Sequence, residues 1–410
     1  MKKIKKIATS VLAVFSSMLC AYAYNVDYGG ELTTGLEASS PWEHYKNLIV
    51  TEDLTGWLFV PISIEKEASV TAQATVQGVM RNVVGYKPDF DFNANLDLLN
   101  FHYNSYDGGS SYWTFNGGRF NFTDTTGLIC NQTSDGAQFS YYSNKVNVSL
   151  YAGYTGLLNR QYTLMINSEG ANYWQQCLEK EEDNRFYKYL NPWADPYLIS
   201  SLKASFPYLF ANQTLSLEAS MYLGINGPSD FSTNNYNRYY FTTGLSGPLF
   251  LNGLNYNLTT TLFTTKFNGM GNMTQGNISW FAGWKDIVFS LTGVYASGED
   301  DGISESLDTF VGFTSKSISY ARYTTEHSAH TKGGFSFSAK PVKTFFVRFG
   351  MDRVFANNKG SFKYEGWQWY ANCELQCTTD FKLSISEFRF FASEESKSSG
   401  GAIIKAHISF

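Results

Sequence analysis

The sequence predicts an all-β protein, a transmembrane antiparallel up-and-down β-barrel of about 18 to 20 strands, or as few as 16. Three observations predict this class. Apolar and polar residues alternate with a period of two along most of the chain. Charged residues make up 16% of the 410 residues, against roughly 25% in soluble domains, and aromatic residues make up 17%. A chain with so few charges is expected to keep part of its outer surface out of water.

The first 23 residues have the pattern of a secretory signal peptide. Four lysines precede an apolar run over 7–20, and Ala21-Tyr22-Ala23 provides the small residues of a cleavage site. The run is too short to span a bilayer as a helix. We therefore expect cleavage after Ala23 and a single barrel domain over 24–410. Because the removed segment carries four lysines and no acid, the net charge changes from −5 to −9, which disfavours nucleic acid as a partner.

The strand pattern begins near residue 28 and continues to the C-terminus. Each alternating run has one apolar and one polar face, because successive side chains of a strand point to opposite sides. The polar faces consist mostly of Asn, Gln, Ser, Thr and Tyr, with Asp91, Asp97 and Glu218 as exceptions. This composition suits the wet interior of a wide barrel whose apolar face meets lipid. The clearest runs are 70–77, 90–97, 146–152, 215–222 and 254–262.

The alternation changes phase at Gly117-Gly118. Trp113 and Phe115 share one parity, and Phe120 and Phe122 have the other. A β-bulge at the two glycines would direct all four rings outward. The same bulge would direct Arg119 and Asn121 inward.

The final strand carries the most specific signal. The chain ends in Phe410, and the residues at every second position before it, from Ile408 back to Ala402, are apolar. This pattern resembles the C-terminal signature of bacterial outer-membrane β-barrel proteins of the porin type. The resemblance implies location in the bacterial outer membrane, contact with its lipid bilayer, and recognition of Ile408 and Phe410 by the barrel-assembly machinery. It also implies that the last strand pairs with the first, near 28–36.

A barrel of this size encloses a channel that is controlled by the groups that line it. The longest region without alternation, about 156–195, is predicted to be an external loop. In trimeric general porins the third external loop folds into the barrel and its acids face basic wall residues. The segment 156–195 is similar in length and acidity, although our strand count makes it the fourth loop, and a homotrimer would fit the same resemblance. The constriction candidates are Glu179, Glu181, Glu182 and Asp183. The lumen-lining candidates, by strand parity, are Arg81, Asp91, Asp97, Arg119, Lys203, Glu218 and Arg348.

Cysteines and histidines add little to this interpretation. Cys130 and Cys177 fall in neighbouring external loops and could form a disulfide, while Cys373 and Cys377 are too close along a strand to pair without a turn. No motif for a metal, a cofactor or a catalytic centre stands out, so we expect none of the three.

Three functions fit the sequence. The first is a porin that passes small hydrophilic solutes through a water-filled channel. The second is a surface adhesin or scaffold that acts through its external loops. The third is a channel selective for a sugar or a lipid, lined by inward aromatic residues such as Tyr151 and Tyr222.

Overall fold

The computed structural model describes most of the chain between Val26 and Phe410. The described residues are 26–42, 45–62, 67–83, 88–105, 109–159, 193–194, 196–225, 237–264, 270–298, 310, 312–314, 329–358, 361–393 and 398–410. The expected signal peptide therefore lies outside the described residues, as does most of the segment 156–195.

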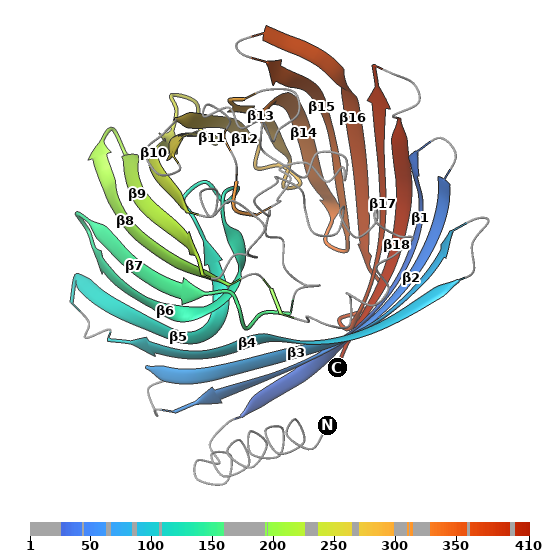
Figure 1. The fold of residues 1–410 in the computed structure, drawn as a ribbon, viewed down its shortest axis with the longest axis horizontal. Helices are drawn as coiled ribbons and strands as arrows, with labels where there is room; N and C mark the ends of the chain where they lie inside the picture. The colour runs from blue at the N-terminus through green and yellow to red at the C-terminus, as the bar shows by residue number, and fades with distance from the viewer. Residues whose placement is uncertain are drawn as a thin grey trace.

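Eighteen antiparallel strands form a single closed sheet in which each strand pairs with its neighbours in sequence (Figure 1). This confirms the predicted fold class and lies at the lower end of the preferred strand count. No helix in the described part of the chain is long and apolar enough to cross a membrane. The strands are β1 Asp27–Trp42, β2 Tyr45–Pro61, β3 Ala68–Val83, β4 Asp89–Asn104, β5 Ser111–Thr123, β6 Asn131–Ser143, β7 Asn147–Tyr154, β8 Tyr197–Phe210, β9 Gln213–Gly224, β10 Arg238–Pro248, β11 Leu254–Thr264, β12 Gly271–Phe281, β13 Val288–Ala296, β14 His330–Val342, β15 Phe345–Asn358, β16 Ser361–Gln376, β17 Phe381–Ala392 and β18 Ser399–Ser409.

The last strand closes the barrel against the first. β18 pairs with β1 from Ser409 opposite Glu31 to Gly400 opposite Ser40, with Ile408 opposite Leu32. Beyond the ladder, Phe410 and Gly30 exchange two backbone hydrogen bonds of 2.9 and 3.0 Å. The predicted closing partner of the terminal strand is thus confirmed, and no edge is left at this junction, as a barrel in hydrocarbon requires.

The two faces of the wall differ in the way the sequence predicts. Large apolar side chains point away from the barrel and are exposed, among them Leu258 (48%) and Leu262 (47%) of β11. Between them, Thr259 and Thr261 point inward and are buried. An apolar exterior and a polar interior are the arrangement of a barrel that sits in a bilayer.

Candidate functional site: the barrel lumen

The wall bends inward along a row of three glycines. Gly118 of β5 lies opposite Gly136 of β6, which lies opposite Gly153 of β7. Gly118 has a φ of 114°, and a Cβ there would collide with the carbonyl oxygen of Leu99. A Cβ at Gly136 would meet the Cα of Gly153 at 2.7 Å. Only residues without a side chain allow the strands to approach this closely, so the part of the β5–β6 hairpin beyond the row turns into the barrel (Figure 1).

The predicted bulge at Gly117-Gly118 is therefore wrong. β5 and β6 keep one unbroken register from Ser111 to Thr123. Phe120 and Phe122 lie on the lumen side, where both are buried and Phe122 stacks on Tyr151 with 4.0 Å between ring centroids. Phe120 and Phe122 occupy every second position of the strand, which is the spacing expected of rings that face lipid. They face inward because loops fill the lumen beside them.

Arg119 consequently lies on the opposite face of β5 from the lumen, which corrects its assignment as a lumen residue. Its guanidinium makes a bidentate pair with Asp135, at 2.8 and 2.7 Å, and donates to the carbonyl oxygens of Leu96 (3.1 Å) and Leu157 (2.9 Å). β4 pairs with β5 only from Leu99 to Asn104. Arg119 therefore satisfies a β4 carbonyl in the region where the backbone ladder is missing.

A short third loop, residues 124–130, fills part of the lumen. Its conformation centres on the buried carboxylate of Asp124, which accepts hydrogen bonds from the backbone N–H groups of Thr126 (2.8 Å) and Cys130 (3.0 Å) and from the Thr126 hydroxyl (2.5 Å). The Thr126 hydroxyl oxygen in turn accepts from the N–H of Leu128 at 3.0 Å. The loop thus satisfies its backbone donors internally, except for that of Thr125, and this permits its burial.

Burial, and after it the nearby charge of Glu218, raise the pKa of Asp124 from 3.8 to about 6, although the hydrogen bonds from Thr126 and Cys130 act to lower it. Asp124 therefore changes its charge within a physiologically accessible pH range. Burial also raises the pKa of the Cys130 thiol.

Hydrogen bonds fix the third loop to the lumen wall. Glu218 of β9 accepts from the backbone N–H of Thr125 at 2.6 Å and from the hydroxyl of Ser201 at 2.7 Å. The side-chain amide of Gln275 on β12 donates to the carbonyl of Thr126 at 3.1 Å. The loop consequently spans the lumen from its own hairpin to the wall of β9 and β12.

A segment of the seventh loop, described at 310 and 312–314, meets the third loop inside the barrel. The backbone N–H groups of Phe313 and Thr314 donate to the carbonyl of Ile129 at 3.0 and 2.8 Å. The Thr314 hydroxyl oxygen accepts from the N–H of Asn131 at 3.1 Å. Arg238 of β10 donates to the carbonyl of Gly312 at 2.9 Å. Two loops far apart in sequence are thus joined within the lumen.

Aromatic packing completes the filled side of the lumen. Phe313 lies 4.4 Å from Tyr222, and Phe310 lies 5.7 Å from Phe263, measured between ring centroids. These rings belong to one buried apolar cluster that covers the inner faces of β5–β13. Tyr151 and Tyr222 are almost fully buried in it, so neither ring is available to line a solute path.

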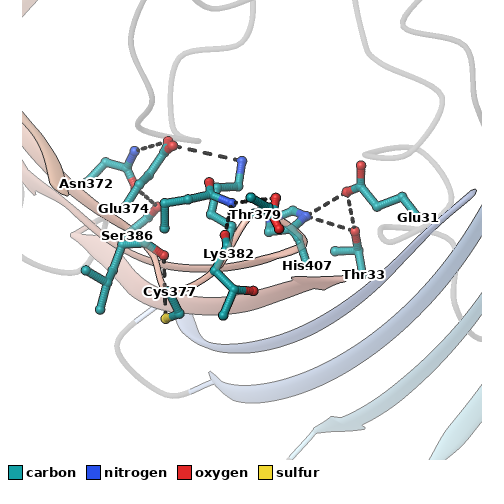
Figure 2. A network of polar contacts seen from close by, with 12 residues as sticks. Glu31, Thr33, Asn372, Glu374, Cys377, Thr379, Lys382, Ser386 and His407 are labelled. Atoms are coloured by element: carbon teal, nitrogen blue, oxygen red, sulfur yellow. Dashed lines mark hydrogen bonds and ion pairs between the residues drawn. The ribbon is translucent and has the colours of Figure 1, made fainter. Parts of the chain in front are cut away.

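The inner faces of β16, β17, β18 and β1 carry charged and polar side chains instead (Figure 2). Glu374 accepts from the amide of Asn372 at 3.0 Å and lies 3.9 Å from the ammonium of Lys382. His407 Nδ1 lies 2.8 Å from a carboxylate oxygen of Glu31. The side chains of Lys382, Glu374 and Glu31 are 38%, 36% and 47% exposed although they point inward. This sector is therefore open to water.

The inner faces of β3 and β4 extend this polar wall, and they carry three of the lumen-lining residues that were predicted from the sequence. Asp97 accepts from the Thr75 hydroxyl at 2.5 Å and from the Asn95 amide at 2.7 Å. Asp91 lies opposite Val79 and Arg81 opposite Asp89, all four on the inner side. The structure thus brings Arg81, Asp91 and Asp97 together on one sector of the wall.

The other lumen candidates occupy separate places. Lys203 of β8 faces inward directly opposite Glu218 of β9, beneath the third loop. Arg348 of β15 faces inward opposite Asn372 of β16, within the water-exposed sector.

The predicted constriction acids Glu179, Glu181, Glu182 and Asp183 lie outside the described residues. Among the described residues, those of the third loop and of the seventh-loop segment lie in the lumen, and Leu158 and Ala194 of the fourth loop belong to the same buried cluster. Cys130 is a free thiol buried in the apolar cluster, and Cys177, the partner predicted for it, lies outside the described residues. Cys373 and Cys377 are free and exposed.

Sequence reasoning missed Asp124, Thr126 and the lumen residues 310 and 312–314. The run Asp124-Thr125-Thr126-Gly127 is a turn signal, since Asp and Thr side chains bond to their own backbone and Gly127 adopts a φ of 68°. No local signal shows that the turn lies inside the barrel.

Comparison with known proteins gives structural matches without sequence matches. No protein-family model matches the chain, and no curated protein matches it. Among solved structures, OccK5 (OpdH) of Pseudomonas aeruginosa superposes with a TM-score of 0.57 at 8% identity, covering 94% of this chain and 98% of that one. The fold is that of a porin-type outer-membrane barrel. OccK11 (OpdR) of Pseudomonas aeruginosa gives a TM-score of 0.56 at 11% identity, covering 94% and 96% of the two chains. The outer membrane protein OpdK from the same organism gives 0.56 at 8% identity, covering 94% and 99%. At these identities the likeness concerns the porin-type fold alone.

Proposed function

We propose that the protein is a passive channel of a bacterial outer membrane that passes small hydrophilic solutes. The observation that carries this proposal is the inward-facing but water-exposed set Glu31, Glu374, Lys382 and His407 within a closed barrel. Charged groups in a lumen stay hydrated and present donors and acceptors to a passing solute. A packed core would have buried apolar side chains in their place.

The in-folded loops support a narrow rather than a wide channel. The third loop and the seventh-loop segment occupy the side of the lumen formed by β5–β13, which leaves the charged sector of β14–β18 and β1–β4 as the path. Both signs of charge line this sector, so we expect small polar and zwitterionic solutes to pass more readily than large neutral ones.

Export through the signal peptide and insertion by the barrel-assembly machinery are part of the proposal. The paired terminal residues Ile408 and Phe410 support the latter. No cluster of three metal-ligating side chains occurs in the part of the chain that the structure describes.

A liposome-swelling series tests the proposal. Liposomes that contain the refolded protein should swell in small sugars and amino acids, with rates that fall steeply as the solute grows. Protein-free liposomes and liposomes with heat-denatured protein provide the controls. Swelling no faster than in these controls for the smallest solutes would contradict a channel.

A further inference from the structure

A cavity lies at the end of the barrel where β1 begins and β18 ends. Its volume is about 540 Å³, and it is lined by Val26, Asp27, Tyr28, Trp57 and Phe59. Sites for small molecules typically have volumes of about 300–1,000 Å³. Three aromatic side chains and one carboxylate therefore surround a space of the size that a small ligand needs.

Two of the three aromatic side chains point into the lumen. In the register of β1 and β2, Trp57 lies opposite Gly29, and Phe59 lies opposite Asp27. Gly29 and Asp27 precede the inward-facing Glu31 by two and four residues, so all of these positions share the inner face. The inner face of the polar sector thus carries two apolar rings at its mouth.

The indole of Trp57 is held against the wall by the absence of a side chain at Gly29. A Cβ at Gly29 would lie 2.7 Å from Cζ2 and 2.9 Å from Cε2 of Trp57. The ring therefore covers the backbone of Gly29, which only a glycine permits. Trp57 is nevertheless 41% exposed, so the face of the ring that points away from the wall is open to the cavity.

The carboxylate of Asp27 brings a negative charge to this cavity. Asp27 makes no hydrogen bond or ion pair within the part of the chain that the structure describes. The neighbouring acid Glu31, by contrast, accepts from the Thr33 hydroxyl at 2.9 Å and lies 2.8 Å from Nδ1 of His407. The charge of Asp27 is therefore available to a ligand.

The chemistry of the walls selects among small ligands. The face of an aromatic ring attracts a cation within about 6 Å of its centre, and Trp does so most strongly. A metal ion such as Ca²⁺ needs about six or more oxygen ligands, which one carboxylate does not supply. A neutral sugar leaves the charge of Asp27 without a partner. A cation whose charge is spread over methyl groups satisfies both the rings and the carboxylate.

We propose that this cavity binds methylated ammonium compounds. Trp57 and Phe59 contact the methyl groups, Asp27 balances the charge, and Tyr28 borders the cavity. The inference rests on the proposed channel, because the two rings lie on the inner face at the mouth, where a solute enters or leaves the polar sector. It adds to that proposal a class of solute and the place at which this solute is held.

Calorimetric titration with choline chloride tests the site. The refolded protein is kept in a maltoside detergent, which carries no ammonium group. We expect saturable binding of choline, and no binding of glucose or of the neutral carbon analogue in which a tert-butyl group replaces the trimethylammonium group. Trp57→Leu should weaken choline binding about two- to five-fold, and Asp27→Asn by at least as much. The control Trp284→Leu removes another exposed indole, in the turn between β12 and β13, and should leave the affinity unchanged.

The fold of each variant is checked by its heat-modifiable migration in gels, and Trp57→Phe, which keeps a ring of weaker attraction for cations, replaces a leucine variant that fails to fold. Equal binding of choline and its neutral analogue would overturn the recognition of a cation. Choline binding that neither Trp57→Leu nor Asp27→Asn weakens would overturn this location. A native protein that conducts ions but does not bind choline would overturn this inference alone, whereas one that binds choline without conducting would contradict the proposed function.

Discussion

The pKa of Asp124 makes the stability of the third loop depend on pH. The docked pKa is about 6 against 3.8 for the free side chain. The docked loop binds the proton more tightly than the undocked loop, so docking is most stable below about pH 4 and weakens as the pH rises through 6. The difference between the two pKa values, about 2, corresponds to about 3 kcal/mol in the free energy of docking. This is roughly a hundred-fold change in the equilibrium between docked and undocked loop.

Single-channel recording at pH 5 and pH 8 measures this effect. Undocking of the loop should appear as brief increases in conductance that are far more frequent at pH 8, because Asp124 is then charged beside Glu218. The matched control is Asp124→Asn, which keeps an acceptor oxygen and removes the titration. If native protein and Asp124→Asn show the same pH dependence, the reasoning about Asp124 is refuted.

Three further perturbations test the parts that shape the lumen. Gly136→Ala should destabilise the barrel by about 1–3 kcal/mol, measured by urea titration in micelles, because the new methyl group meets backbone atoms of β7. The control Gly56→Ala, whose new methyl group has nothing within 4 Å, should leave the unfolding midpoint unchanged. Arg119→Ala should lower the free energy of unfolding by about 3–5 kcal/mol in the same titration, since it leaves the carboxylate of Asp135 unpaired in a partly buried site. A loss below 1 kcal/mol would contradict a stabilising role for this ion pair. Thr314→Val should weaken the contact between the two loops by about 1–2 kcal/mol and raise the mean conductance, and an unchanged conductance would show that the loops do not narrow the path.

Period-two alternation and the terminal strand carried most of the information about the fold. The antiparallel pairing of β18 with β1 follows from a closed barrel with an even number of strands. Parity within a strand also placed Glu218 and Arg348 on the lumen side, because register preserves the alternation wherever the ladder is regular.

The inner loops could not be predicted because their contacts are not local. Phe120 and Phe122 are apolar, and parity by itself assigns apolar residues to the lipid face. They lie inside because the segments around Ile129 and Phe313, nearly two hundred residues apart, meet in the lumen and provide an apolar surface there. Arg119 was misplaced by the same error, since a bulge was needed to direct those rings outward.

The central claim is that the inner face of the barrel is in water while the outer face is in lipid. Cysteine accessibility at neighbouring positions of β17 tests it directly, since Ser384 points into the lumen and Ile385 points outward. In proteoliposomes of a background without other cysteines, a membrane-impermeant charged thiol reagent should modify Ser384→Cys rapidly and reduce the conductance, and should not modify Ile385→Cys. Equal modification of both positions, or modification of Ile385→Cys alone, would contradict the account.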